Sequence, residues 1–357
     1  MWPYVLVFLV PAILSLFARK QYAENVKTPI GNIGWVAFAI TLALFIGWRW
    51  EVGADWSAYA RYMRQAENSG LGEVLAGKDP GYQLINWIVA SAGLGIVTVN
   101  LICGTIFAVA LTRFCRILPL PWLGIAVAIP YAVTVVVMGY SRQGVALGLV
   151  LFALVALSER RVLHFVVWVV VATTFHKSAI LLLPIAALSA SQGRFWAVLW
   201  VGAFGVLGYW LLVHDSLDVL YSTYVEAQYQ SEGAFIRVAM NLLPAAILLT
   251  KQKKFKFAPS ERRLWKLFAW MSVGLFCLLL LTPASTAVDR VALYMLPLQF
   301  VVFSNLPVRF GSSVGGRFFI TAAIIGFYAS VLLVWLNYAG HADAWVPYRF
   351  FPFVEEY

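Results

Sequence analysis

The chain has 357 residues, of which 62% are hydrophobic and only 12% are charged, and its mean hydropathy is +0.82. This composition excludes a soluble globular protein built around one buried core. The formal net charge of +10 could point to a nucleic-acid-binding protein, but the basic residues cluster in short loops between apolar runs, which argues for a membrane protein. We predict an all-α polytopic membrane protein in which residues 1–357 form a single integral membrane domain.

Twelve apolar segments follow one another along the chain. They cover residues 2–18, 30–48, 82–112, 121–139, 143–157, 162–175, 178–190, 195–213, 234–250, 267–283, 291–306 and 318–338. Most approach the roughly 20 residues that a helix needs to cross a bilayer. We therefore expect about 12 crossings.

The first and third segments need separate comment. No basic region precedes the first segment, and Arg19 and Lys20 follow it, so we interpret it as a span and not as a cleavable signal peptide. The third segment is long and carries Gly93 and Gly95 near its middle. We expect one crossing there, or one crossing preceded by a surface helix.

The charged residues divide unequally between the two sides of the predicted membrane. One side receives 17 of the 26 Lys and Arg residues with only three acids, and the other side receives nine basic residues with 13 acids. The densest basic cluster lies within residues 251–266. Because basic residues are enriched in cytoplasmic loops, we assign the first side to the cytoplasm and both termini to the outside.

Two longer segments lie on the outer side. Residues 49–81 include a stretch, 56–76, with aromatic residues and Met63 at helical spacing among charges, which predicts an amphipathic helix on the membrane surface. Residues 214–233 are rich in Tyr, Gln and acidic residues. Such side chains suit sugar binding, but the tyrosines alone fit a membrane-interface belt better.

The 49–81 segment opens with the first candidate site. Arg49, Glu51 and Asp55 place a cation and two carboxylates directly after an apolar run. An ordinary membrane-edge anchor explains Arg49 alone about as well as a site does. The close spacing of the two acids favours a site. Asp79 and the Pro-Gly-Tyr82 turn close the same segment, with a mainly structural interpretation.

A second candidate lies in the short connection before residue 143. Arg142 precedes Gln143 between two long apolar runs. A cation there must face protein or a water-filled cavity, because contact with lipid is costly. A helix that starts with a basic residue also offers backbone N–H groups to an anion. Together these features favour phosphate binding.

A third candidate interrupts the apolar stretch from 162 to 190. His176 and Lys177 lie there between threonines and Ser178, where polar residues are costly unless they meet solvent or a ligand. A single histidine is more often a structural hydrogen-bonding group. Its neighbour Lys177 makes His176 a candidate general acid or base, or a phosphate ligand.

The fourth candidate opens the eleventh apolar segment. Arg290 and Tyr294 are four residues apart and share a helix face. An interfacial pair between Asp289 and Arg290 is the simpler interpretation. Because Arg142 and Arg290 start equivalent outer helix ends, we favour a shared anion site, with Arg237 as a weaker member.

Taken together, these segments resemble the EpsG-type, Wzy-like polysaccharide polymerases of bacterial membranes. The resemblance rests on short motifs that occur in the family's order over nearly the whole chain. They are Arg49 with Gly53-x-Asp55, Pro80-Gly81-Tyr82, Ser141-Arg142-Gln143 followed by Ala146, Phe175-His176-x-Ser178-Ala179, Arg290 with Tyr294, and Trp345-x-Pro347-Tyr348. The chain departs from the pattern at Trp56, where the family more often has Tyr, and at Asp79, where Glu is commoner.

The resemblance implies a membrane glycosyltransferase of GT-C-like architecture in the bacterial plasma (inner) membrane, with its active site facing the periplasm or exterior. The donor would be a growing glycan on undecaprenyl diphosphate, and the acceptor a single lipid-linked repeat unit. A chain-length regulator and a flippase of the same pathway are candidate partners, besides membrane lipid, and nucleic acid is not expected.

We assign the following roles by hypothesis. Arg142 and Arg290, helped by Arg49 or Lys177, hold the donor diphosphate. Asp55, then Glu51, or alternatively His176, takes the proton of the acceptor hydroxyl. Further substrate contacts are expected from Gln143, Tyr294, Tyr82 and Arg237. No acidic cluster has metal-ligand spacing, and we expect no metal and no cofactor.

Three alternatives belong to other classes. A lipid-linked oligosaccharide flippase would need polar residues throughout its spans, whereas the charges here concentrate at the ends. An O-antigen ligase shares the donor chemistry and differs only in the acceptor, so the sequence does not separate it from a polymerase. A membrane O-acyltransferase uses a histidine but does not need several outward arginines.

Overall fold

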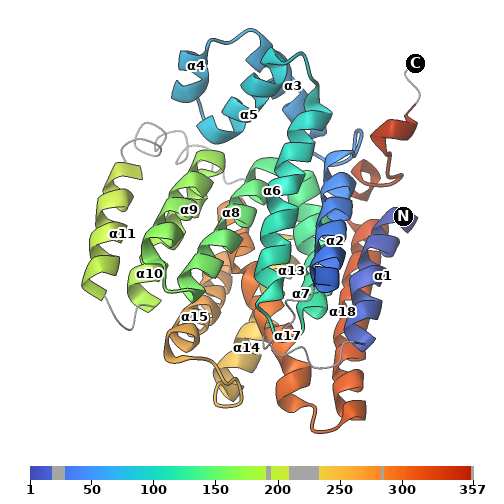
Figure 1. Ribbon diagram of the computed structural model, residues 1–357, viewed down its shortest axis with the longest axis vertical. Coiled ribbons are helices and arrows are strands. Elements are labelled where there is room, and N and C mark those ends of the chain that lie inside the picture. The colour runs from blue at the N-terminus through green and yellow to red at the C-terminus, as the bar shows by residue number, and fades with distance from the viewer. Residues whose placement is uncertain (18–28, 190–193, 209–232, 283–284, 355–357) are drawn as a thin grey trace.

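The structure is a computed structural model that describes residues 1–17, 29–189, 194–208, 233–282 and 285–354. Its long elements are helices, and their labels follow Figure 1. They are α1 (Trp2–Phe17), α2 (Pro29–Gly47), α3 (Trp56–Glu67), α4 (Leu71–Ala76), α5 (Pro80–Ser91), α6 (Ile96–Arg116), α7 (Pro121–Ala128), the π-helix η1 (Ile129–Val137), α8 (Ser141–Ser158), α9 (Val162–Phe175), the 3₁₀ turn η2 (Lys177–Leu182), α10 (Leu183–Ser189), α11 (Arg194–Gly208), α13 (Ala234–Ala239), α14 (Leu242–Lys251), α15 (Pro259–Leu281), α16 (Ser285–Ala292), η6 (Leu293–Met295), α17 (Leu296–Phe310), α18 (Val314–Tyr338), η7 (Ala342–Ala344) and η8 (Phe351–Phe353).

Each of the twelve predicted apolar segments is largely helical where the structure describes it, and short turns interrupt the third at residues 92–95 and the ninth at residues 240–241. Within the described residues, six helices are long and apolar enough to cross a membrane by length and composition. They are Ile96–Arg116, Ser141–Ser158, Ala234–Lys251, Pro259–Leu281, Ser285–Phe310 and Val314–Tyr338. Shorter apolar helices accompany them, including α1 and α9. The chain is therefore an all-α polytopic membrane protein, and the number of 12 crossings remains a prediction.

The long third segment is broken as its glycines predict. Helix α5 ends at Ser91, and α6 begins at Ile96 after the turn that contains Gly93 with φ of +70°. Helix α5 packs against α3 and α4, so these three short helices form a cap at the upper end of Figure 1. A single helix over 56–76 was predicted, and this is wrong in detail, because Asn68 to Gly70 separate α3 from α4.

Helix α8 lies at the centre of the bundle. Most of its residues are buried, and it packs mainly against α6 and α9. Helix α17 is buried to a similar degree, whereas α15 and α18 expose apolar side chains such as Leu281 and Phe319. Buried central helices and apolar outer surfaces are what a bundle surrounded by lipid requires.

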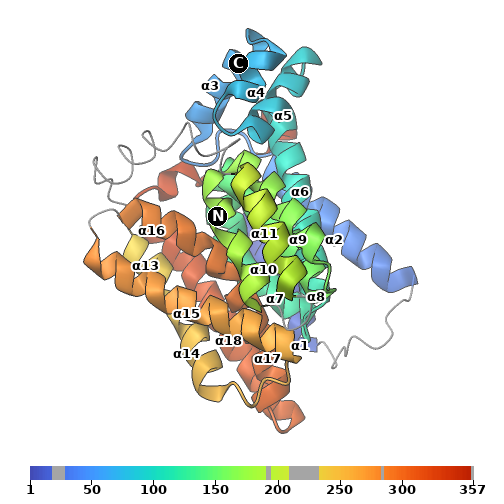
Figure 2. The ribbon, with the colours of Figure 1, turned by 90° about the vertical axis from the view of Figure 1, so that its left-hand side faces the viewer.

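The helices alternate in direction, so that charged loops gather at two opposite ends (Figures 1 and 2). At the lower end, Glu159 pairs with Arg113 and Arg161, and Lys254 lies 4.7 Å from the centre of the Phe310 ring. The upper end carries α3 to α5 and the first turn of α8. The sorting of charges between the two sides of a membrane and the orientation of the chain remain predictions.

The C-terminal segment returns to the upper end and packs against earlier helices. Trp345 is buried, donates its indole N–H to the Thr134 carbonyl at 2.7 Å, and accepts the Tyr4 hydroxyl at its own carbonyl at 2.7 Å. The Tyr348 hydroxyl donates to the Phe45 carbonyl at 2.7 Å. Through these contacts the Trp345-x-Pro347-Tyr348 motif stabilises helices that lie far from it in the sequence. The predicted second outer segment, 214–233, lies outside the described residues except for Gly233.

Candidate functional site

The structure brings together residues from all four candidate groups at the upper end of the bundle. Arg142 contacts Asp79, and Gln143 contacts the backbone of Arg290. The charges of Arg142 and Arg290 both act on Asp55 and on His176. We call Asp55, Asp79, Arg142, His176 and Arg290 the cation cluster.

Arg142 is the best-defined member of this cluster. Its Nη1 atom donates to Asp79 Oδ2 at 2.5 Å, and its guanidinium carbon lies 5.1 Å from the centre of the Tyr62 ring. The side chain is 26% exposed and that of Asp79 is 11% exposed. Burial raises the pKa of Asp79 despite the nearby positive charges of Arg142, Lys177 and Arg290. Lys177 therefore lies close enough to belong to the same electrostatic field.

A close helix approach positions Asp79 against Arg142. A Cβ atom at Gly81 would come within 2.3 Å of Thr174 Oγ1, so only glycine allows the start of α5 to pack against the end of α9. Asp79 itself has φ of +52°, in the left-handed region that aspartate tolerates better than most residues. The Pro-Gly-Tyr82 motif thus brings the carboxylate to its partner arginine.

Asp55 projects from the loop between α2 and α3. Gly53 in this loop has φ of +110°, and a Cβ atom there would come within 2.3 Å of the Met138 carbonyl oxygen. Burial raises the pKa of Asp55, opposed by Arg290 and Arg142. Among the described residues, no side chain donates a hydrogen bond to its carboxylate. In this respect Asp55 differs from Asp79, whose carboxylate accepts from Arg142.

His176 lies where α9 ends and η2 begins. Its Nδ1 atom is 2.7 Å from Ser178 Oγ. Burial, together with the positive charges of Arg290 and Arg142, lowers the pKa of His176 to about 3. The imidazole is consequently neutral at physiological pH and is a weak base in this form of the protein.

Gln143 connects α8 to the element that carries Arg290. Its Nε2 atom donates to the Arg290 carbonyl at 2.6 Å. One turn later, the hydroxyl of Tyr294 is buried near Ser178 and finds no hydrogen-bond partner in the described part of the chain. Both members of the predicted pair, Arg290 and Tyr294, therefore lie near the turn that carries His176 and Ser178.

Tyr82 occupies the interior of the cap. It is fully buried and packs against Tyr59 and Tyr62, with ring centroids 5.4 and 6.3 Å apart. The buried Tyr82 side chain therefore cannot contact a substrate directly in this structure, contrary to the prediction. The two neighbouring tyrosines lie beside Arg142, and the sequence assigned them only to a membrane surface.

Arg49 is separated from the cluster by its own hydrogen bonds. It is 1% exposed, and its guanidinium donates to the carbonyls of Ile46 and Val52, to Asn100 Oδ1 at 3.1 Å and to Ser141 Oγ at 2.8 Å. A guanidinium used in this way joins the end of α2 to α6 and to the start of α8. We assign Arg49 the role of positioning Arg142, and not of binding the diphosphate.

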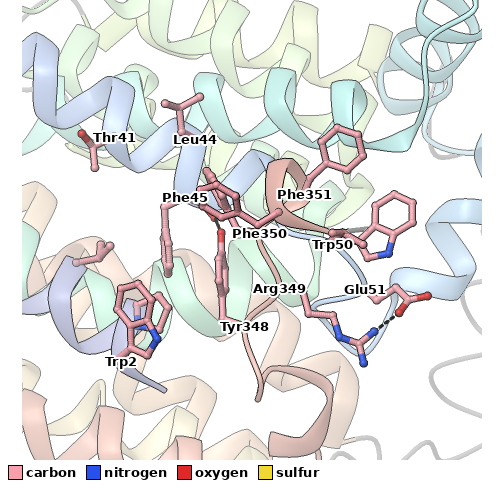
Figure 3. Close-up of a pocket in the computed structure, with 14 residues that line it drawn as sticks. Trp2, Thr41, Leu44, Phe45, Trp50, Glu51, Tyr348, Arg349, Phe350 and Phe351 are labelled. Atoms are coloured by element: carbon pink, nitrogen blue, oxygen red, sulfur yellow. Dashed lines mark hydrogen bonds and ion pairs between the residues drawn. The ribbon is translucent and has the colours of Figure 1, made fainter. Parts of the chain in front are cut away.

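Glu51 also lies apart from the cluster. Its carboxylate pairs with Arg349 of the C-terminal segment at the edge of an apolar groove. Figure 3 shows this ion pair and the groove beside it. The structure thus separates Glu51 from Asp55, although only four positions divide them in the sequence.

Arg237 is held by Asp289. The Arg237 Nη2 atom lies 2.6 Å from Asp289 Oδ2, and Nε lies 3.1 Å from both carboxylate oxygens. The side chains are 16% and 11% exposed. The interfacial pair of Asp289 with Arg290 that their adjacency predicted is therefore replaced by a pair with Arg237. This pair clamps α13 to α16.

A metal centre has no basis in the part of the chain that the structure describes. Within those residues, no group of three or more His, Cys, Asp or Glu side chains could hold a metal ion. The three cysteines also lie apart as free thiols. Metal-independent catalysis remains a prediction.

A known protein family matches nearly the whole chain, including this arrangement. Residues 32–350 match the EpsG family. The chain belongs to the EpsG family. The match covers every residue of the cation cluster and extends through Trp345 and Tyr348 of the EpsG-family motif near the C-terminus. No curated protein and no solved structure matches the chain. Membership of the EpsG family implies a membrane protein with a polysaccharide polymerase-like role.

Proposed function

We propose that the protein is a polysaccharide polymerase, a membrane glycosyltransferase that joins undecaprenyl-diphosphate-linked oligosaccharide repeat units on the outer face of the bacterial plasma membrane. The observation that carries this proposal is the convergence of Arg142 and Arg290 with two carboxylates at one end of the bundle. Family membership supplies the class of reaction.

Arg142 and Arg290 are the proposed ligands of the donor diphosphate. The charges of both arginines act on Asp55 and Asp79, and the charge of Lys177 acts on Asp79 as well. Burial makes the charged form of each carboxylate less favourable. An entering diphosphate would compete with Asp79 for Arg142. Arginine suits this task because its planar donors match phosphate oxygens.

The proposed reaction is a direct transfer of the glycan to the acceptor hydroxyl. The hydroxyl oxygen of the lipid-linked repeat unit forms a bond to the anomeric carbon of the donor sugar. The bond from that carbon to the diphosphate oxygen breaks, and its electron pair leaves with undecaprenyl diphosphate. Asp55 accepts the hydroxyl proton, while Arg142 and Arg290 stabilise the negative charge that develops on the leaving group.

His176 is the second candidate for the base. Burial and the charges of the two arginines lower the pKa of its imidazole. A bound diphosphate would reverse this field and raise the pKa, because an anion favours the protonated imidazole. In the free protein Asp55 remains the better candidate.

A GT-C-like architecture with about 12 crossings remains part of the proposal. The ligase alternative keeps the same donor site and differs in its acceptor. The flippase alternative has less support, because the polar network that joins Asn241, Gln299 and Tyr328 in the bundle interior carries no charge.

Deletion of the gene separates these alternatives. A polymerase is expected to leave single repeat units on the cell exterior while long polymer disappears, and the wild-type gene should restore the polymer. Absence of single repeats from the exterior would instead indicate a flippase. Accumulation of long polymer that is not attached to its final acceptor would indicate a ligase.

A further inference from the structure

A large groove lies next to the ion pair of Glu51 and Arg349. Its volume is about 1410 Å³, and it is bounded by the start of α1, the last turns of α2 and the C-terminal segment (Figure 3). Its walls include Trp2, Thr41, Phe45, Trp50 and Tyr348. Pockets for small ligands usually measure about 300 to 1,000 Å³. The groove therefore has room for a ligand larger than a single metabolite.

The walls of the groove are largely aromatic and aliphatic. Trp2 is 72% exposed and Phe353 is 83% exposed. The adjacent outer faces of α1 and α2 are apolar, with Leu6, Ile33 and Ile40 more than half exposed. Large uncovered apolar surfaces mark sites of contact with lipid or another apolar partner. A hydrocarbon chain could thus enter the groove from the bilayer without crossing a polar surface.

The polar end of the groove is electrically balanced. Arg349 pairs there with Glu51, and both side chains are about half exposed. A phosphate at this end would have to displace Glu51 from the arginine. The groove is therefore better suited to the chain of a lipid than to its charged group.

Residues next to the cluster in the sequence contact the same end of the groove through Trp50 and Arg49. Trp50 lines the groove and follows Arg49, which donates a hydrogen bond to Ser141 at 2.8 Å. Ser141 precedes Arg142. The Trp50 ring also packs against Trp56, 5.6 Å away between centroids, and Trp56 follows Asp55. Trp50 thus relates the end of the groove to the sequence neighbours of both Arg142 and Asp55.

We propose that this groove holds the polyisoprenoid chain of a lipid-linked substrate, and that the phosphates of that substrate extend from the groove toward the cation cluster. The assignment rests on the proposed function, since it is the polymerase reaction that supplies a lipid-linked substrate. A phospholipid fits less well, because its phosphate is joined through a short glycerol unit to its chains and would meet the neutralised Arg349.

Site-specific photo-crosslinking tests the occupant. Thr41 and Ile40 are adjacent on α2 and both exposed, but only Thr41 lines the groove. A photoreactive phenylalanine derivative at each position, in the full-length protein in phospholipid vesicles, is irradiated with radiolabelled undecaprenyl phosphate. We expect a crosslink at position 41 that falls several-fold when unlabelled undecaprenyl phosphate is added. At position 40, any crosslink should be weak and unaffected by the competitor.

Three results would overturn the proposal. They are equal crosslinking at both positions, a crosslink at position 41 that undecaprenyl phosphate does not displace, and displacement by added phospholipid alone. The last result would assign the groove to a structural phospholipid. The crosslink reports lipid binding in the groove and does not depend on the polymerase reaction. That reaction is measured separately, as long glycan made by the wild-type protein, so failure of the groove assignment can be distinguished from failure of the proposed function.

A kinetic comparison adds a second readout. Thr41→Trp fills the groove, whereas Ile40→Trp places the same side chain on the neighbouring exposed position. We expect Thr41→Trp to raise KM for a long-chain lipid-linked repeat unit several-fold with little change in kcat, and Ile40→Trp to match the wild type. The difference should vanish with a carrier of two or three isoprene units. An equal effect of both variants, or an effect that does not depend on carrier length, would contradict the assignment.

Discussion

Arg142 in the first turn of α8 is ion-paired with Asp79 at the start of α5, with 2.5 Å between Nη1 and Oδ2. The central helix of the bundle is thereby tied to the cap formed by α3, α4 and α5. In the proposed mechanism, the same arginine must also bind the donor diphosphate. Asp79 therefore has two effects, since it stabilises the cap and competes with the substrate.

Asp79→Asn separates these two effects. The amide keeps the shape of the side chain but lacks the charge, so the free energy of unfolding should fall by about 1 to 3 kcal/mol for this partly buried pair. Inorganic diphosphate should then stabilise the variant at lower concentrations than the wild type, because its competitor is weakened. Thermal unfolding in detergent, with diphosphate titrated into both proteins, measures both quantities. An unchanged diphosphate dependence would show that Arg142 does not bind this anion.

The pH dependence of the reaction distinguishes Asp55 from His176. A base is active when deprotonated, so kcat/KM should fall as pH decreases through the pKa of the base in the free protein. Burial raises the pKa of Asp55, which places the decline above the usual range of aspartate. If His176 were the base, the decline would lie near pH 3. Asp55→Asn should lower the rate at least ~10²-fold. If kcat/KM of this variant still declines over the same pH range, Asp55 is excluded as the base.

The pair of Arg237 and Asp289 should act on stability and not on chemistry. Removing either partner leaves a charge in a position that is more than 80% buried, at a cost of about 3 kcal/mol. Arg237→Met with Asp289→Leu should recover most of that loss, since both buried charges are then removed together. Folded yield and thermal stability provide the measurement. A double variant that is stable but forms no polymer would instead return Arg237 to the substrate site.

The positions of the helices and of Arg142, Arg290 and His176 near one end could be predicted from the sequence. Long apolar runs and the sorting of basic residues depend on local composition, which a single sequence contains. The break before Ile96 was also accessible, because glycines next to an apolar run predict a turn.

The partners of the charged residues could not be predicted in the same way. Asp289 lies next to Arg290 in the sequence but pairs with Arg237, and Glu51 pairs with Arg349 nearly 300 residues away. Arg49 is recognisable as a motif residue, yet its use as a buried hydrogen-bond donor depends on the packing of α2, α6 and α8. Such choices are made by tertiary contacts, for which sequence proximity is a poor guide.

Gly53 provides a test of how the site is assembled. Alanine would be strained at its φ of +110°, and its Cβ atom would collide with the Met138 carbonyl oxygen. We expect Gly53→Ala to move the loop that carries Asp55 and to reduce polymer formation by at least ~10²-fold. Gly72→Ala is the control, because a Cβ atom there has open space. Near-normal polymer in Gly53→Ala would show that the position of Asp55 does not matter for the reaction.

In the proposed mechanism Arg142 binds the donor diphosphate during polymerisation. Reconstitution of the purified protein measures whether polymerisation depends on this arginine. Wild-type protein in vesicles is incubated with undecaprenyl-diphosphate-linked repeat units, with and without EDTA, and glycan length is measured by gel electrophoresis. Arg142→Ala is compared with Arg64→Ala, which removes an exposed arginine of the cap. We predict long glycan from the wild type and from Arg64→Ala, with or without EDTA, and none from folded Arg142→Ala. Long glycan from Arg142→Ala at the wild-type rate would contradict this role of Arg142.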